Sequence, residues 1–171
     1  EHSRQVPRTA RVIGKAGSPL GGRDIDHWIV AALHPDRQGC TALLQAAERL
    51  KCRLSQVERD DEPLLELATP EPGSRLELRL DRGGLEALLL QRGLLEHLDG
   101  LLESVAAAAR REGLQLQRLD AVLPVGGSSR IPLIRRWLQE RLSGVPLHGE
   151  RPVEAVALGA LALTPGVRVR D

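Results

Sequence analysis

Apolar residues recur along the chain at two spacings, one typical of helices and one typical of strands. A first helix is predicted after Asp24, a residue type typical of the position that caps a helix. Its apolar face would comprise Ile25, Trp28, Ile29 and Leu33. A second helix is predicted over 41–54, and its buried face would comprise Leu43, Ala47, Leu50 and Leu54.

Strand and turn signals come next. Pro63 and the segment 70–73 mark strands and a turn, and the segment 75–80 alternates strictly, as a half-buried strand does. Asp81 then caps a helical stretch over 85–112, with a break near Gly93. Further strands are predicted over 11–15 and 119–125, and further helices over 131–142 and 153–163.

This order of elements predicts an α/β protein with two connected parts. An α/β base would be formed by residues 1–22 and 111–171. An inserted subdomain, a β-hairpin with helices, would comprise residues 23–110. A length of 171 residues suits one or two domains with a real core.

Charge and composition exclude several partners. The 24 basic and 23 acidic side chains leave a net charge of +1, so there is no electrostatic case for binding nucleic acid or a membrane. The chain has two Trp and no Phe or Tyr, which argues against aromatic stacking on exposed bases. The core is expected to consist mainly of Leu, Val and Ala.

The two cysteines, Cys40 and Cys52, fall in one predicted helical region, too far apart along it to form a disulfide. We expect reduced thiols and a cytoplasmic protein, without metal-ligand spacing. The chain begins at Glu1 and contains no Met, so we expect it to start inside a longer protein. No apolar run is long enough for a membrane span.

The second predicted helix carries three polar residues, Glu48, Lys51 and Ser55, on the stripe opposite its leucines. One interpretation is an exposed face with a single Glu–Lys pair, worth about 0.2–0.5 kcal/mol. The other is a row of an acceptor, an ammonium donor and a hydroxyl that holds ribose hydroxyls and an adenine edge.

The run Gly126-Gly127-Ser128-Ser129-Arg130-Ile131 follows the predicted strand 119–125 and precedes Pro132. Paired glycines remove side chains where a backbone must approach something closely. A helix beginning at the proline would point unpaired N–H groups at the same place. The pattern indicates a site for a phosphate or a ribose-phosphate edge.

Four segments in order resemble motifs of the 70-kDa heat-shock (DnaK-type) chaperones. They are the segments 18–26, 44–55, 126–132 and 151–160. The resemblance implies that Glu48 and Lys51 contact ribose and that Ser55 contacts adenine. It also implies backbone contacts at the Gly126–Gly127 pair, with Ser128, Ser129 and Ile131 in the same motif, and stacking of Arg130 on the base.

Two positions depart from the family pattern. Cys52 stands where family members carry an Arg or an aliphatic residue that covers the base, so it offers less stacking area. Val153 stands where the family has an Asp, and Arg151 where it has an Asn. These departures fall in the motifs that the resemblance assigns to the nucleotide pocket.

The resemblance implies the actin-like ATPase fold and, within it, most of the second lobe (lobe II) of the ATPase domain. The expected cofactor is ATP or ADP, with Mg²⁺ in the intact parent protein and no Mg²⁺ ligands in this chain. The family's phosphate-binding loops and catalytic Lys have no match here, so the chain alone is predicted to be inactive. Expected partners are a nucleotide-exchange factor, a J-domain co-chaperone, and peptide clients bound through a domain that this sequence lacks.

Two alternatives stay open. In the first, the chain is a protein-binding platform with a degenerate nucleotide pocket, on which exchange factors dock without ATPase turnover. In the second, it is another actin-like protein, such as a sugar kinase or a filament protein, against which the Gly126–Ile131 run argues. The five histidines are dispersed, and the acidic run 60–62 is typical of a solvated turn.

Overall fold

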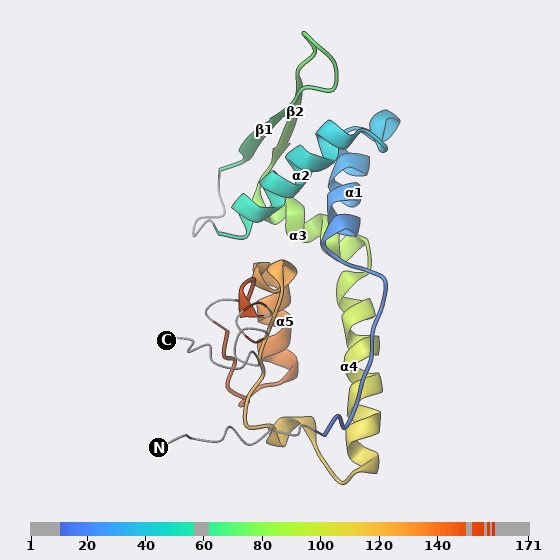
Figure 1. Ribbon diagram of the computed structural model, residues 1–171, viewed down its shortest axis with the longest axis vertical. Helices are drawn as coiled ribbons and strands as arrows, with labels where there is room; N and C mark the ends of the chain where they lie inside the picture. Colours follow the sequence, from blue (N-terminus) through green and yellow to red (C-terminus); the bar gives the residue numbers. More distant parts are fainter. Residues whose placement is uncertain (1–10, 57–61, 150–151, 156, 158, 160–171) are drawn as a thin grey trace, which may run out of the picture.

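The computed structural model describes residues 11–56, 62–149, 152–155, 157 and 159. Its helices and strands are α1 (Gly22–Leu33), α2 (Thr41–Leu54), β1 (Leu64–Ala68), β2 (Leu76–Leu80), α3 (Arg82–Gln91), α4 (Leu94–Arg111) and α5 (Pro132–Arg141). Three short 3₁₀ helices are η1 (Pro35–Arg37), η2 (Leu116–Arg118) and η3 (Gly127–Arg130). Figure 1 shows α1, α2, α3 and the hairpin in an upper part, with α4 descending beside α5.

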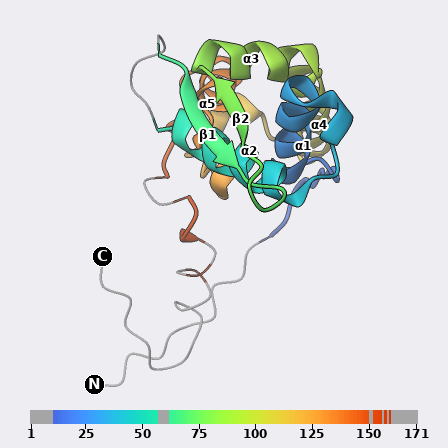
Figure 2. The ribbon, with the colours of Figure 1, turned by 90° about the horizontal axis from the view of Figure 1, so that it is seen from above.

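Strands β1 and β2 form the predicted hairpin, with Leu64 paired to Leu80 and Ala68 paired to Leu76. Side chains alternate between its faces, so Ala68 and Leu78 are buried while the outward Leu65 and Leu67 stay exposed. Helix α2 packs on the hairpin and on α1. Seen from above, the hairpin and α1 lie on different sides of this part, and α3 runs along a third (Figure 2).

One hydrophobic core holds the upper part together. It combines the apolar faces of α1, α2 and α3 with the inner face of the hairpin and the first turn of α4. The apolar stripe predicted for α2 is confirmed, because its four members are all buried. Ile131 and Leu133, from the start of α5, insert into the same core. The polypeptide before α5 is thereby fixed against α1 and α2.

A second, smaller core lies between the far end of α4 and α5. Its buried members are Ala109, Leu116, Leu142 and Val145. Helix α4 reaches both cores, since Leu94 belongs to the first and Ala109 to the second. Helix α4 therefore links the upper and lower parts (Figure 1).

Helix ends follow local chemistry. Asp81 caps α3 as predicted, and its Oδ1 accepts a hydrogen bond from Gly84 N at 2.6 Å. The predicted break between α3 and α4 is confirmed at Gly93, whose φ of +70° favours glycine. The predicted cap of α1 was wrong by one turn. The helix begins at Gly22, and Asp24 reaches back from its first turn to accept from Gly21 N at 2.7 Å.

Two predicted strands are absent from the described residues. The segment 11–15 runs without regular structure along α4, where a Cβ on Gly14 would lie 3.1 Å from Ala108 Cβ. In 119–125, only Val122 forms a bridge, a parallel one to Leu147. A strand needs a neighbour that satisfies its backbone, and this part of the described chain provides a single bridge. The predicted helix 153–163 falls largely outside the described residues.

The described residues are thus mainly helical, with one two-stranded sheet. The predicted α/β class therefore holds in that the described residues contain both helices and strands, but their strands form only this two-stranded sheet. Within the described ranges, no helix has the length and apolar character that crossing a membrane would require.

Candidate functional site

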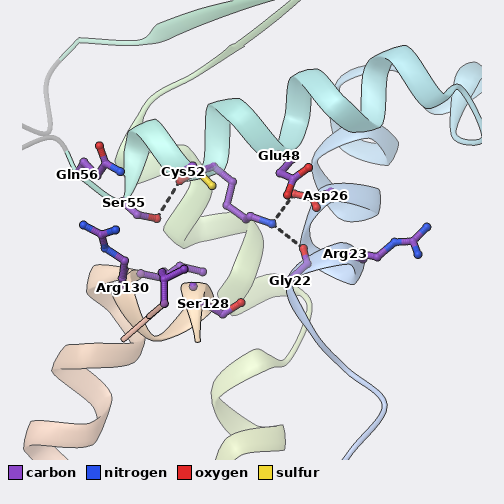
Figure 3. A pocket seen from close by; sticks show the side chains of 13 residues that line it. Gly22, Arg23, Asp26, Glu48, Cys52, Ser55, Gln56, Ser128 and Arg130 are labelled. Carbon is purple, nitrogen blue, oxygen red and sulfur yellow. Dashed lines mark hydrogen bonds and ion pairs between the residues drawn. The ribbon is translucent and has the colours of Figure 1, made fainter. Parts of the chain in front are cut away.

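A cavity of about 340 Å³ opens where α1, α2 and the turn before α5 meet (Figure 3). It is lined by Gly22, Arg23, Asp26, Glu48, Lys51, Cys52, Ser55, Gln56, Gly127, Ser128, Arg130, Ile131 and Val153. These residues come from four segments that are far apart in the sequence. Packing of the first core around Ile131 is what brings the turn to the two helices.

Helix α2 supplies one wall of the cavity. Glu48 and Cys52 are exposed, while Ser55 is half-buried. The Ser55 hydroxyl donates to Lys51 O at 2.8 Å, which leaves its oxygen lone pairs to accept a further bond. The wall therefore presents carboxylate, thiol and hydroxyl groups in sequence along one face of the helix (Figure 3).

Lys51 lies deeper than the pattern of α2 suggests, with a residue exposure of only 8%. Its Nζ lies 2.6 Å from Asp26 Oδ1 and donates to Gly22 O at 2.8 Å. The approach to Asp26 falls outside hydrogen-bond angles, so this contact is an ion pair held by charge. The interpretation of Lys51 as part of an exposed face was wrong, because α1 covers it. Its partner for charge is Asp26 on α1.

Asp26 is itself buried, with 6% exposure. Burial raises the pKa of its carboxyl above the ordinary value of 3.8, and the nearby Glu48 charge raises it further. Lys51 opposes both effects, since its ammonium stabilises the carboxylate and lowers the pKa, and His27 also lowers it. Desolvation is the largest of these influences. The floor of the cavity is therefore a charged pair in a partly dry environment.

The turn before α5 forms the opposite wall. Gly126 has a φ of +85° and a ψ of 159°, and its N–H donates to Pro152 O at 2.7 Å. Ser129 Oγ donates to Gly126 O at 2.7 Å and closes the turn. Gly127, at the cavity, has no atom within 4 Å of where a Cβ would lie. This turn thus exposes bare backbone to the cavity.

Arg130 and Ile131 point in different directions from the end of this turn. Ile131 is buried in the first core, with 1% exposure. Arg130 is exposed and rises toward the end of α2, where Ser55 and Gln56 lie (Figure 3). Its guanidinium therefore stands at the mouth of the cavity, on the side of the predicted base-binding residues.

Eight of the ten predicted site residues line this one cavity, as described above. Gly126 and Ser129 are outside its lining and instead shape the turn. The predicted helix start at Pro132 is confirmed, because α5 begins there, but its first turn does not follow the glycines directly. Four residues form η3 first, and the N–H groups of Ser129 and Ile131 bond within the turn, to Gly126 O and Ser128 O.

Five lining residues were not predicted as site residues: Gly22, Arg23, Asp26, Gln56 and Val153, the last of which was noted only as a departure from the family motif. A signal was available for Asp26, which lies three and four residues before the buried Ile29 and Val30. A carboxylate on the apolar side of a helix calls for a buried partner. Within the described ranges, no three Asp, Glu, His or Cys side chains come together as metal ligands. Cys40 and Cys52 are both free thiols, as predicted.

Comparison with known proteins identifies the family of the chain. The family model described as Hsp70 protein matches residues 18–170. The chain belongs to the Hsp70 family. Relatives include the chaperone protein DnaK of Thermotoga petrophila, 34% identical over 94% of this chain and 30% of that protein. The DnaK of Thermus thermophilus is 34% identical over 89% of this chain and 27% of its own length.

The dnaK3 chaperone of Synechococcus elongatus is 35% identical over 86% of this chain and 21% of its own length. The chain thus spans less than a third of the length of these relatives. Membership of the Hsp70 family confirms the resemblance seen in the sequence motifs and implies the actin-like ATPase fold. The Hsp70 match covers all four segments that form the cavity.

Proposed function

We propose that the chain is the nucleoside-binding lobe, lobe II, of the ATPase domain of an Hsp70-type chaperone. One observation carries the proposal: five residues of the segment 48–56 and four of the segment 127–131 line a single cavity of about 340 Å³. That volume lies within the range of about 300–1,000 Å³ typical of small-molecule pockets. The adenosine part of ATP or ADP is the ligand that the Hsp70 match favours.

The residues present suit such a ligand. Glu48 would accept from a ribose hydroxyl, and Lys51 would donate to one through an N–H that Gly22 leaves unused. The Ser55 oxygen would accept from the base. Arg130 would stack its guanidinium on the base from the cavity mouth, since a planar cation packs well on a π face.

Phosphoryl transfer is not assigned to these residues. It requires groups that surround the γ-phosphate and a Mg²⁺ ion, and the sequence carries no motif for either. Mg²⁺, when bound in a longer parent protein, would neutralise charge on the phosphates. The residues described here would bind and orient the nucleoside.

At the level of the whole protein, the proposal is an ATP-dependent chaperone of the cytoplasm that acts in protein folding and the stress response. Closure of two lobes around ATP would control the release of a peptide client. A J-domain co-chaperone and an exchange factor would regulate the cycle. Support comes from the DnaK relatives and from the two free thiols, which suit a reducing compartment.

Residues 23–110 are proposed to form the inserted subdomain of this lobe, and residues 1–22 and 111–171 its base. The first core supports this boundary, because most of its members lie within 25–94. Ile131 and Leu133 are the exceptions that tie the insert to the base.

A second candidate function is a protein-binding platform without ATPase turnover. It is favoured by Val153 and Cys52, which line the cavity where the family motif has an Asp and a larger side chain. The exposed outer face of the hairpin, with Leu65 and Leu67, would supply the docking surface. ATP hydrolysis by the intact parent protein would exclude this candidate.

An amide NMR titration of the chain with ADP, up to millimolar concentration, tests the main proposal. Shifts concentrated at residues 48–56 and 127–131 are expected. Glu48→Ala, Lys51→Ala and Arg130→Ala should each weaken ADP binding. Arg135→Ala is the matched control, because Arg135 is exposed on α5 and lies outside the cavity lining. Unchanged affinity in all three cavity variants would contradict the proposal.

A further inference from the structure

The floor of the cavity holds the two charged side chains that are buried in the described part of the chain, Asp26 and Lys51. Asp26 comes from α1 and Lys51 from α2, so the pair joins the helices across the cavity floor. Both side chains also line the cavity. A charged pair in this place needs an explanation beyond packing.

Packing alone does not require it. The two helices already meet through fully buried apolar side chains, among them Ile25, Ile29 and Leu50. Desolvating two charges is costly, and well-packed apolar residues of similar size often stabilise a fold as well or better. The pair is therefore better explained by what it does to the cavity.

The geometry of the Lys51 ammonium gives that explanation. A lysine Nζ carries three N–H groups in tetrahedral directions. Here one N–H donates to Gly22 O at 2.8 Å and Asp26 Oδ1 holds the ammonium by charge at 2.6 Å, and both partners belong to α1. The N–H groups that Gly22 does not use are left for the cavity that the side chain lines. Without a fixed anchor, the flexible four-carbon stem of lysine would sample many directions.

We infer that Asp26 is a positioning residue, which acts through Lys51 by holding its ammonium in place so that an N–H not used by Gly22 faces the ligand. The inference rests on the proposed nucleoside site and assigns a role to a residue outside the predicted set. Gly22 completes the arrangement, because a Cβ there would lie 3.3 Å from Lys51 Nζ and 3.1 Å from Ser128 Oγ. Glu48, the other carboxylate of this wall, is exposed and remains available to the ligand.

The test is a double-mutant cycle on ADP binding by the 171-residue chain, using wild type, Asp26→Asn, Lys51→Met and the double variant. Asp26→Asn keeps the shape of the side chain and removes its charge. We expect it to weaken ADP binding about tenfold, the size of one lost hydrogen bond to a charged donor. In the Lys51→Met background, the same change should alter the affinity less than twofold. Asp36→Asn, an exposed charge change in η1, is the control and should leave the affinity unchanged.

A separate readout reports on Lys51 without nucleotide. The rate at which an amine-reactive reagent labels Lys51, followed by peptide mass spectrometry, should rise several-fold in Asp26→Asn and stay unchanged in Asp36→Asn. Asp26→Glu is the second variant in case Asp26→Asn does not fold. It keeps the charge but displaces the carboxylate by one methylene, and should show the same dependence on Lys51.

Two results would overturn the inference. Equal losses of ADP affinity in the wild-type and Lys51→Met backgrounds would mean that Asp26 acts through general packing, and would overturn the inference. Unchanged labelling of Lys51 in the Asp26 variants would overturn it as well. If wild type binds no ADP, the proposed function fails and the ligand role of Asp26 with it. Labelling would then still decide whether Asp26 holds Lys51.

Discussion

The indole N–H of Trp137 donates to Asp99 Oδ1 at 2.8 Å and so ties α5 to α4. Arg141, one turn later on α5, contacts the same carboxylate through two nitrogens, at 2.7 and 2.6 Å. A bidentate guanidinium fixes both distance and orientation. This carboxylate is therefore the main polar link between the two helices that flank the second core.

These contacts predict an acid-dependent loss of stability. The hydrogen bonds from Arg141 and Trp137 lower the pKa of Asp99 below its ordinary value of 3.8. A carboxyl with a lowered pKa in the folded state stabilises the fold above its unfolded pKa, and this contribution is lost as the pH falls through the folded value. Asp99→Asn should thus be less stable than wild type at pH 7, and the difference should shrink below about pH 4.

Urea denaturation at a series of pH values measures this difference. Glu103→Gln, at an exposed position one turn further along α4, is the control and should follow the wild-type curve more closely. A constant gap between wild type and Asp99→Asn from pH 7 to pH 2 would contradict the prediction.

The burial of Ile131 predicts that the turn before α5 is anchored in the first core. Ile131 follows Arg130 in the sequence. Its side chain is 1% exposed and packs in the first core, together with apolar residues of α1 and α2. Ile131→Ala should lower the free energy of unfolding by about 2–5 kcal/mol, and Ile131→Val by about 0.5–1.5 kcal/mol. Leu123→Ala, at a side chain that is 69% exposed, should change it by less than about 0.5 kcal/mol. An Ile131→Ala effect as small as that of Leu123→Ala would mean that this turn is not anchored in the core.

The helices could be predicted from the sequence because their signals are local. Apolar spacing located α2 to the residue, and Gly93 marked the break between α3 and α4. The segments 11–15 and 119–125 contain the apolar residues that favour strands, yet a strand also needs a neighbour, which a local pattern does not reveal. Val122 finds only a single bridge in the described chain.

The site could be predicted in outline but not in depth. Spacing placed Glu48, Lys51 and Ser55 on one stripe of α2, and they do line one cavity. The stripe could not show that α1 covers part of it and buries Lys51 against Asp26. That burial depends on how two helices cross, which is a tertiary property. The turn residues were found because glycine and proline leave a strong local mark.

Cys52 offers a prediction about affinity for the base. It lines the cavity beside Ser55 and across from Arg130, where a larger side chain would cover a bound base. Cys52→Arg should add a planar cation against the base and strengthen ADP binding about two- to fivefold. Cys52→Ser is the matched control, because it keeps the size and adds no stacking surface. Isothermal titration calorimetry would measure both, and equal affinities would show that the base does not lie against position 52.

At the two glycines of the turn before α5, we expect substitution by alanine to change stability by very different amounts. Gly126 has a φ of +85° and a ψ of 159°, a combination that side chains strongly disfavour. Gly126→Ala should therefore lower the free energy of unfolding by about 1–3 kcal/mol. Gly127 lies in η3 with open space around its Cα, so Gly127→Ala should leave stability within about 0.5 kcal/mol of wild type.

For ADP binding the expected order is reversed. Gly127 lines the cavity and Gly126 does not, so a methyl group at 127 would occupy space that a ligand needs for close approach to the backbone. Gly127→Ala should weaken ADP binding while the protein remains as stable as wild type. Gly126→Ala should lose stability and, measured at a temperature where it is folded, bind ADP more tightly than Gly127→Ala. Chemical denaturation and ADP titration of the same two variants check both halves, and a loss of stability in Gly127→Ala with unchanged ADP affinity would contradict them.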